Sequence, residues 1–151
     1  MTPSDFLHMA SSGVDFSGTL TGLVKFMNVE SNCKHYVHTN TVAKVNQFAD
    51  LMVSYLQNEA CKPALDILIN LTYCSVNTCI YLSDVLQIVP QLAHLADDYP
   101  CEVNWLLAHL LNDGRPDVRR LVSSRYFYRL RNSLDNTAIS VGTALLQRLQ
   151  S

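Results

Sequence analysis

The sequence predicts an all-α protein built from a repeated group of short helices, and three observations support this prediction. A segment of about 39 residues recurs along the 151-residue chain. Within each copy, the apolar residues are three and four positions apart, which places them on one face of an α-helix. Turn-forming residues fall between the copies at similar intervals. Alternation of apolar and polar residues, which would indicate strands, is absent from the sequence.

Four copies of the segment align, and two alignment columns are apolar in every copy. These columns are Phe26, Leu68, Leu107 and Leu146, and Val29, Leu71, Leu110 and Leu149. A third column holds Ile67, Leu106 and Leu145, and Lys25 interrupts it. We therefore expect each copy to be an amphipathic helix that buries these residues.

The helices are expected to form triplets, because a shorter apolar segment and a second helical segment precede each of the last three copies. Asp97–Pro100 separates two helices of one triplet, and Asn112–Pro116 separates one triplet from the next. The predicted organisation is a single domain over residues 1–151. Its parts are an N-terminal cap and lone helix (1–29) and repeats at about 30–73, 74–112 and 113–150.

Composition favours one globular domain inside the cell. Hydrophobic residues make up 48% of the chain and charged residues 16%, which suits a packed core and not a disordered chain. No apolar run is long enough to cross a bilayer, and the N-terminus lacks the features of a signal peptide. We therefore expect a protein of the cytoplasm or nucleus, in which the five cysteines are reduced and pack as small apolar residues.

The repeat resembles the armadillo repeat, and most closely that of importin-α. The segment Ile88–Leu92 is similar to the apolar-Pro-x-Leu element of the second helix in that family. Trp105 and His109 are similar to its Trp-x-x-x-Asn element in the third helix, and Asn28 and Asn70 match the Asn of that element. The resemblance implies an armadillo-like right-handed α-solenoid of short helical triplets, with about three and a half repeats.

In the importin-α family, the third helices line a concave groove in which Asn side chains hydrogen-bond an extended peptide and Trp side chains hold its lysines. The resemblance implies a ladder of groove residues, namely Asn28, Asn70, His109 and Arg148. It also implies companion pocket positions, namely Val24, Asp66, Trp105 and Ala144. Because only two ladder positions are Asn and one pocket position is Trp, we expect a diverged relative of this family or a segment of a longer array, and not a working import adaptor.

We therefore predict a non-enzymatic protein–protein interaction module, an adaptor or scaffold that binds an extended or helical segment of another protein in a groove. The alternative is a structural assembly protein that oligomerises through its solenoid ends. No cofactor and no catalysis are expected, because the sequence holds neither a Gly-rich phosphate loop nor a recognisable nucleophile with its base. Cys33, His35 and His38 are suitable zinc ligands, but no fourth ligand is evident nearby, so no metal is expected.

Charge is distributed unevenly: residues 1–114 carry a net charge of −7, and residues 115–151 carry +5. The arginines of the second segment are expected to pair with an acidic protein patch, so neither nucleic acid nor a membrane is an expected partner. The last predicted helix carries Leu145, Leu146 and Leu149 with no following repeat to cover them. Because solenoid ends need a polar cap or a partner, we expect this C-terminal helix to pair with a second copy, to dock a partner or to continue into a longer array, and a two-fold homodimer is the preferred interpretation.

Overall fold

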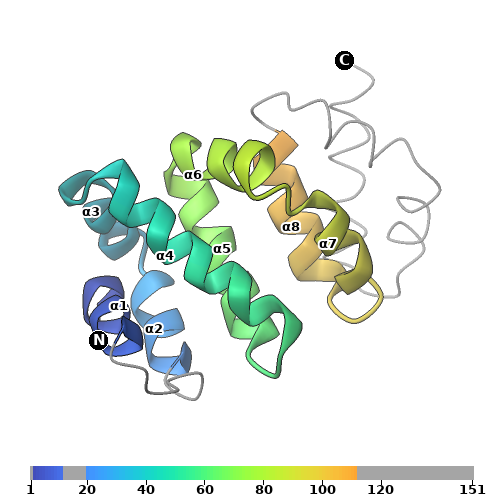
Figure 1. The fold of residues 1–151 in the computed structure, drawn as a ribbon, viewed down its shortest axis with the longest axis horizontal. Coiled ribbons are helices and arrows are strands. Elements are labelled where there is room, and N and C mark those ends of the chain that lie inside the picture. Colours follow the sequence, from blue (N-terminus) through green and yellow to red (C-terminus); the bar gives the residue numbers. More distant parts are fainter. Residues whose placement is uncertain (1, 12–19, 112–151) are drawn as a thin grey trace. The chain divides into compact units, whose positions relative to one another are not determined.

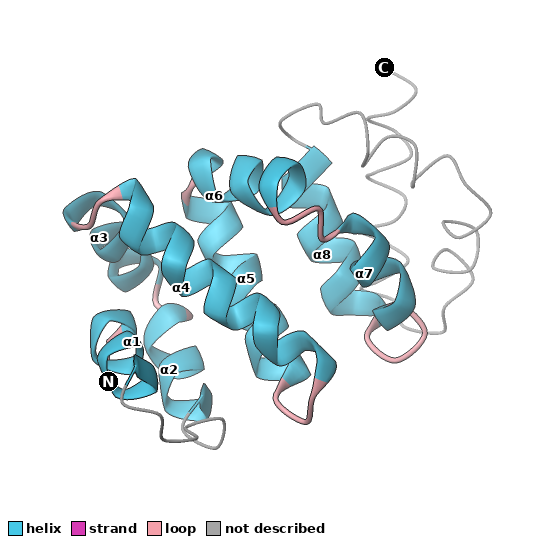
Figure 2. Cartoon of the chain, viewed as in Figure 1, coloured by secondary structure: helices cyan, strands magenta, loops and turns pink. Residues whose placement is uncertain are grey.

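In a computed structural model of the chain, the described residues are 2–11 and 20–111, and these residues form α-helices and no strands (Figures 1 and 2). The all-α prediction is therefore confirmed for this part of the chain, whereas the third predicted triplet, 113–150, lies outside it. The chain divides into two compact units, Met1–Thr78 and Cys79–Ser151. No helix among the described residues is both long enough and apolar enough to cross a membrane.

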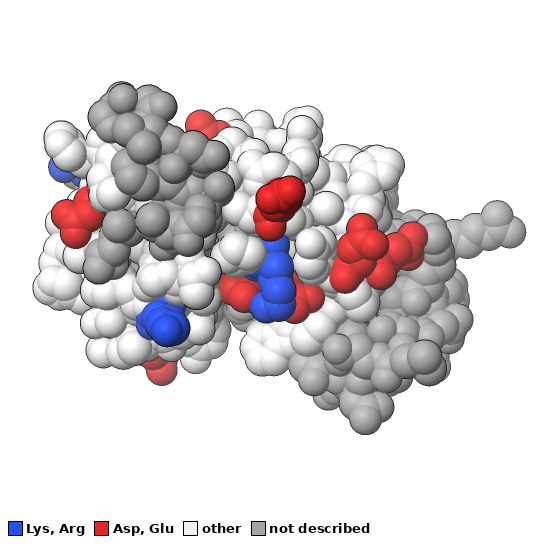
Figure 3. Space-filling view, turned by 90° about the horizontal axis from the view of Figure 1, so that it is seen from below, with Lys and Arg blue, Asp and Glu red and all other residues white. Residues whose placement is uncertain are grey.

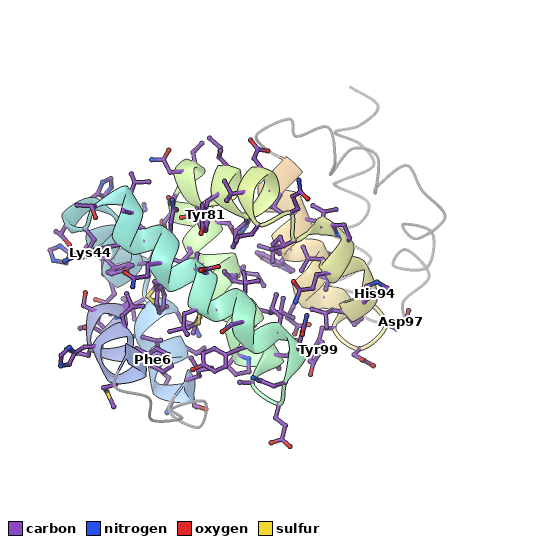
Figure 4. All side chains as sticks on the ribbon, viewed as in Figure 1. Phe6, Lys44, Tyr81, His94, Asp97 and Tyr99 are labelled. Atoms are coloured by element: carbon purple, nitrogen blue, oxygen red, sulfur yellow. The ribbon has the colours of Figure 1, made fainter. Side chains whose placement is uncertain are left out.

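The first helix, α1 (Pro3–Ser11), begins with a reciprocal cap. The Thr2 hydroxyl accepts from the Asp5 N–H at 3.2 Å, and the Asp5 carboxylate accepts from the Thr2 N–H at 3.1 Å. The Thr2 backbone N–H, followed by the Thr2 side chain, hydrogen-bonds the Asp5 carboxylate and lowers its pKa, because these contacts favour the charged form. The cap fixes the start of a helix whose Phe6 is fully buried (Figure 4) and packs edge-to-face on Tyr55, with ring centroids 6.2 Å apart.

The next helix, α2 (Leu20–Met27), ends earlier than the alignment of the first repeat copy predicts. Leu20, Leu23 and Met27 are fully buried, whereas Val29, predicted to be buried, is 47% exposed. The prediction for Val29 is wrong because α2 ends at Met27 and Val29 already precedes the following helix as its N-cap residue. The apolar column therefore does not continue past the end of α2.

The other helices of the first unit are α3 (Glu30–Thr39), α4 (Val42–Ser54) and α5 (Cys61–Cys74). Thr41 begins α4, since its hydroxyl accepts from the Lys44 N–H at 3.2 Å. A 3₁₀ turn, Tyr55–Gln57, follows α4. Packing between α3 and α4 includes Tyr36 and Phe48, whose rings meet edge-to-face at 5.7 Å.

The core of the first unit is centred on α5, which packs against α2, α3 and α4. Its residues Ile67, Leu68 and Leu71 are fully buried, as the repeat columns predict. At about 1.5 to 3 kcal/mol for each fully buried Leu or Ile side chain, this face contributes a large share of the hydrophobic stabilisation of the unit.

The second unit is described from Cys79 to Leu111. The helix α6 (Val76–Ile80) spans the boundary between the units and continues into a π-helical turn, Tyr81–Val85. It is followed by α7 (Val89–Leu95) and α8 (Pro100–Leu111), which pack against each other. Pro100 is the first residue of α8, where its missing N–H costs little.

The apolar columns also predict the core of the second unit. Leu106, Leu107 and Leu110 of α8 are fully buried. The corresponding predictions for Leu145, Leu146 and Leu149 fall outside the described residues.

We predict that Leu107→Ala lowers the free energy of unfolding by about 2 to 5 kcal/mol, because it removes a fully buried side chain and leaves a cavity. The matched control is Val85→Ala in the same unit, where the valine is 64% exposed and the expected change is within about 0.5 kcal/mol. Urea unfolding followed by circular dichroism measures both. Equal effects of the two substitutions would contradict the assignment of this column to the core.

Candidate functional site

Two of the predicted ladder residues, Asn28 and Asn70, meet in the first unit. The Asn70 Nδ2 donates a hydrogen bond to the Asn28 Oδ1 at 2.7 Å, although the residues are 42 positions apart in the sequence. Asn28 lies just after α2, where its backbone N–H donates to the Val24 carbonyl at 2.8 Å, and Asn70 lies on α5. The packing of α2 against α5 therefore brings together the side chains that the sequence placed in equivalent positions.

After its mutual hydrogen bond has formed, the amide pair still has one NH₂ group that can donate and one carbonyl oxygen that can accept. The bond between the side chains uses one donor of Asn70 and one lone pair of Asn28. The Asn28 Nδ2 and the Asn70 Oδ1 make no hydrogen bond with another described residue. Because Asn28 is exposed and Asn70 half-buried, the pair presents a donor and an acceptor side by side to an external group.

The backbone of Asn70 is held from the other side by a buried thiol. The Cys33 Sγ on α3 donates to the Asn70 carbonyl at 3.4 Å. A contact of the same kind recurs in the second unit, where the Cys79 Sγ donates to the His109 carbonyl at 3.9 Å. Cys33 and Cys79 occupy matching positions in the repeat, as do Asn70 and His109, so the repeated sequence produces a repeated contact.

The outer face of α5 continues beyond Asn70 in both directions. Asp66, Asn70 and Tyr73 are spaced at four and three residues, which places them along one side of the helix, away from Leu68 and Leu71. The half-buried Asp66 forms an exposed ion pair with Lys62 one turn earlier, at 3.0 Å, so its carboxylate is engaged within the helix.

Sequence reasoning missed Tyr73, which is 64% exposed and adds an apolar ring one turn beyond Asn70. Tyr73 lies outside the predicted ladder and pocket positions, which follow the Asn and Trp of the family motif. The signal was nevertheless present, because an aromatic residue three positions after Asn70 falls on the same outer face of the helix.

In the second unit, Trp105 and His109 lie one turn apart on α8. Trp105 is 42% exposed and His109 is half-buried, and their rings meet edge-to-face with centroids 6.3 Å apart. Glu102 lies three residues before Trp105 and is also half-buried. These side chains form a second candidate surface, which combines an indole face, an imidazole and a carboxylate.

The described part of the second unit is acidic in sequence. Residues 79–111 contain four carboxylates and no Lys or Arg, and Asp97 lies in the turn between α7 and α8 (Figure 4). On the face of the molecule in Figure 3, uncharged residues make up most of the described surface, and the charged side chains stand in small groups. Trp105 therefore lies in a stretch of the sequence that carries only acidic charge.

The remaining predicted site residues fall into two groups. Val24 is half-buried on α2, and its backbone carbonyl accepts the hydrogen bond from the Asn28 backbone N–H. Ala144 and Arg148, and the C-terminal helix predicted to form a homodimer, lie outside the described residues.

The structure separates the three side chains that raised the possibility of a zinc site. Cys33 is buried and directed at the Asn70 carbonyl, whereas His35 and His38 are exposed on α3. Within residues 2–11 and 20–111, no group of three His, Cys, Asp or Glu side chains is placed to hold a metal ion.

Comparison with models of known protein families, with curated proteins and with solved structures found no match to this chain. The resemblance to the armadillo repeat therefore stays a prediction based on the motifs of the sequence.

We predict an energetic coupling between the two ladder asparagines. In a double-mutant cycle with Asn28→Ala and Asn70→Ala, the coupling in the free energy of unfolding should be about 0.5 to 1 kcal/mol, as for one side-chain hydrogen bond near the surface. The control cycle pairs Asn70→Ala with Gln47→Ala, which removes an exposed amide from α4. If both cycles give the same coupling free energy, the hydrogen bond between the amides does not stabilise the pair of ladder residues.

Proposed function

We propose that this chain is a non-enzymatic protein-binding module that binds an extended segment of a partner polypeptide, in an adaptor or scaffold role. The observation that carries the proposal is the amide pair of Asn28 and Asn70, which offers a donor and an acceptor at one place on the surface. An extended peptide has unpaired backbone C=O and N–H groups, and it needs this combination in a binding protein.

The arrangement of the amide pair favours binding because the two side chains hold each other in place. Each asparagine would otherwise lose rotamer freedom when a peptide binds. Their mutual hydrogen bond at 2.7 Å restricts that freedom beforehand. Tyr73, one turn further along α5, offers an exposed ring for an apolar side chain of the bound segment.

The second surface suits a basic side chain of the partner. A Lys or Arg placed over the face of Trp105 would gain a cation–π interaction of about 0.5 to 2 kcal/mol. Glu102 lies one turn before Trp105, and residues 79–111 carry four carboxylates and no Lys or Arg.

An armadillo-like solenoid forms part of the proposal, and two recurrences support it. The same apolar columns are buried in α5 and α8, through Leu68 and Leu107 and through Leu71 and Leu110. A buried cysteine also contacts the carbonyl of the ladder residue in each unit. In a solenoid, such recurrence is expected because every repeat makes similar contacts.

The proposal is tested with peptides selected from a random display library against the full chain. We expect Asn70→Ala to weaken the binding of a selected peptide about 5-fold to 10-fold, since a side-chain hydrogen bond contributes about 1 kcal/mol. We expect Trp105→Ala to weaken the binding of peptides that contain Lys or Arg by a similar factor. Isothermal titration calorimetry measures both affinities.

Gln47→Ala serves as the control, because it removes an exposed amide from α4 and should leave the affinity unchanged. Circular dichroism verifies that each variant is folded. A folded variant that lacks both Asn28 and Asn70 and still binds the peptides with wild-type affinity would overturn the proposal.

A further inference from the structure

Two cysteines of the first unit, Cys33 on α3 and Cys74 at the end of α5, lie on helices that pack against each other. The Cys33 Sγ donates to the Asn70 carbonyl at 3.4 Å. Cys74 is the last residue of α5, one turn beyond Asn70. The carbonyl contact places the Cys33 Sγ at the turn of α5 that leads to Cys74.

Packing alone does not require the second thiol. In the second unit, Cys79 corresponds to Cys33 and makes the equivalent contact with the His109 carbonyl. The position that corresponds to Cys74, 39 residues further along the sequence, is Asp113. The repeat therefore needs the first cysteine for its recurring contact, whereas the second unit has no cysteine at the position that corresponds to Cys74.

We propose that Cys33 and Cys74 form a reversible disulfide, which links α3 to the end of α5 when the protein meets a hydroperoxide. This inference goes beyond the proposed binding function and does not depend on it. Neither Cys33 nor Cys74 forms a disulfide in the structure described above.

The different environments of the two thiols set the order of the reaction. Cys74 is half-buried, so an oxidant reaches it, whereas Cys33 is almost fully buried. Burial, together with the adjacent Cys74, raises the pKa of Cys33, so this side chain stays a thiol and is a poor first nucleophile. Cys74 is therefore the residue that reacts first.

The reaction proceeds in two balanced steps. The Cys74 thiolate attacks the hydroperoxide, the O–O bond breaks, Cys74 becomes a sulfenic acid and the alcohol, or water from hydrogen peroxide, leaves. The Cys33 sulfur then attacks the Cys74 sulfur, the S–S bond forms and the S–O bond breaks. The departing hydroxide takes the Cys33 proton and leaves as water. Two thiols have lost two electrons, which the hydroperoxide has taken up.

The disulfide would change the surroundings of the ladder residue. The Cys33 Sγ can no longer donate to the Asn70 carbonyl once it has lost its proton. The new covalent bond fixes α3 against the helix that carries Asn70. Oxidation is therefore expected to raise the midpoint of thermal unfolding, because the cross-link restricts the unfolded chain.

The test uses the reduced full chain, treated with hydrogen peroxide, blocked with N-ethylmaleimide and digested without reduction. We expect mass spectrometry to find a peptide pair joined through Cys33 and Cys74, lighter by two hydrogens than the reduced pair and separated again by dithiothreitol. The pair should also form in the control Cys79→Ser, which alters the equivalent cysteine of the second unit. Recovery of Cys74 unlinked, or linked to a different cysteine, would overturn the proposal.

Two variants keep the test informative if one of them does not fold. Cys33→Ser retains a donor for the Asn70 carbonyl, and in this variant we expect Cys74 to accumulate as a sulfenic acid that dimedone traps. Cys74→Ser changes a half-buried position, and here we expect Cys33 to stay unmodified. Rapid oxidation of Cys33 in the absence of Cys74 would contradict the proposed order of reaction.

Discussion

The burial of one apolar face on α5 and on α8 is the constraint on which the rest of the structure depends. Leu68 and Leu71 are fully buried on α5, as are Leu107 and Leu110 on α8. Because a helix has a fixed period, burying these leucines directs the residues on the opposite side outward, including the two candidate surfaces. The core and the site are therefore specified by the same pattern, and a change of helix register would move both.

Asn70 connects the core of the first unit to its surface. Its carbonyl accepts from the buried Cys33 thiol, and its side chain donates to the exposed Asn28, so the residue is held from the inside and the outside at once. The second unit repeats the inner contact between Cys79 and the His109 carbonyl, but it places an imidazole and the adjacent Trp105 where the first unit has an amide. Similar scaffolding thus supports chemically different surfaces in the two units.

The sequence predicts the helices and their buried leucines well where the apolar run is long, as between Ala64 and Leu71. It fails at Val29, because no Gly or Pro marks the end of α2 and the actual end depends on where α3 begins. The sequence also places Asn28 and Asn70 in equivalent positions, but their mutual hydrogen bond depends on how α2 packs against α5. Tyr73 was missed because its role follows from exposure, which a column of matching residue types does not contain.

The central claim is that the amide pair contacts the backbone of a bound extended segment. Nuclear magnetic resonance tests it most directly, by titrating a display-selected peptide into the ¹⁵N-labelled full chain and following the side-chain NH₂ signals. If the amide pair makes this contact, the signals of Asn28 and Asn70 shift as the peptide binds, while that of Gln47 on α4 stays in place. Saturated binding with no change at Asn28 and Asn70 would contradict it.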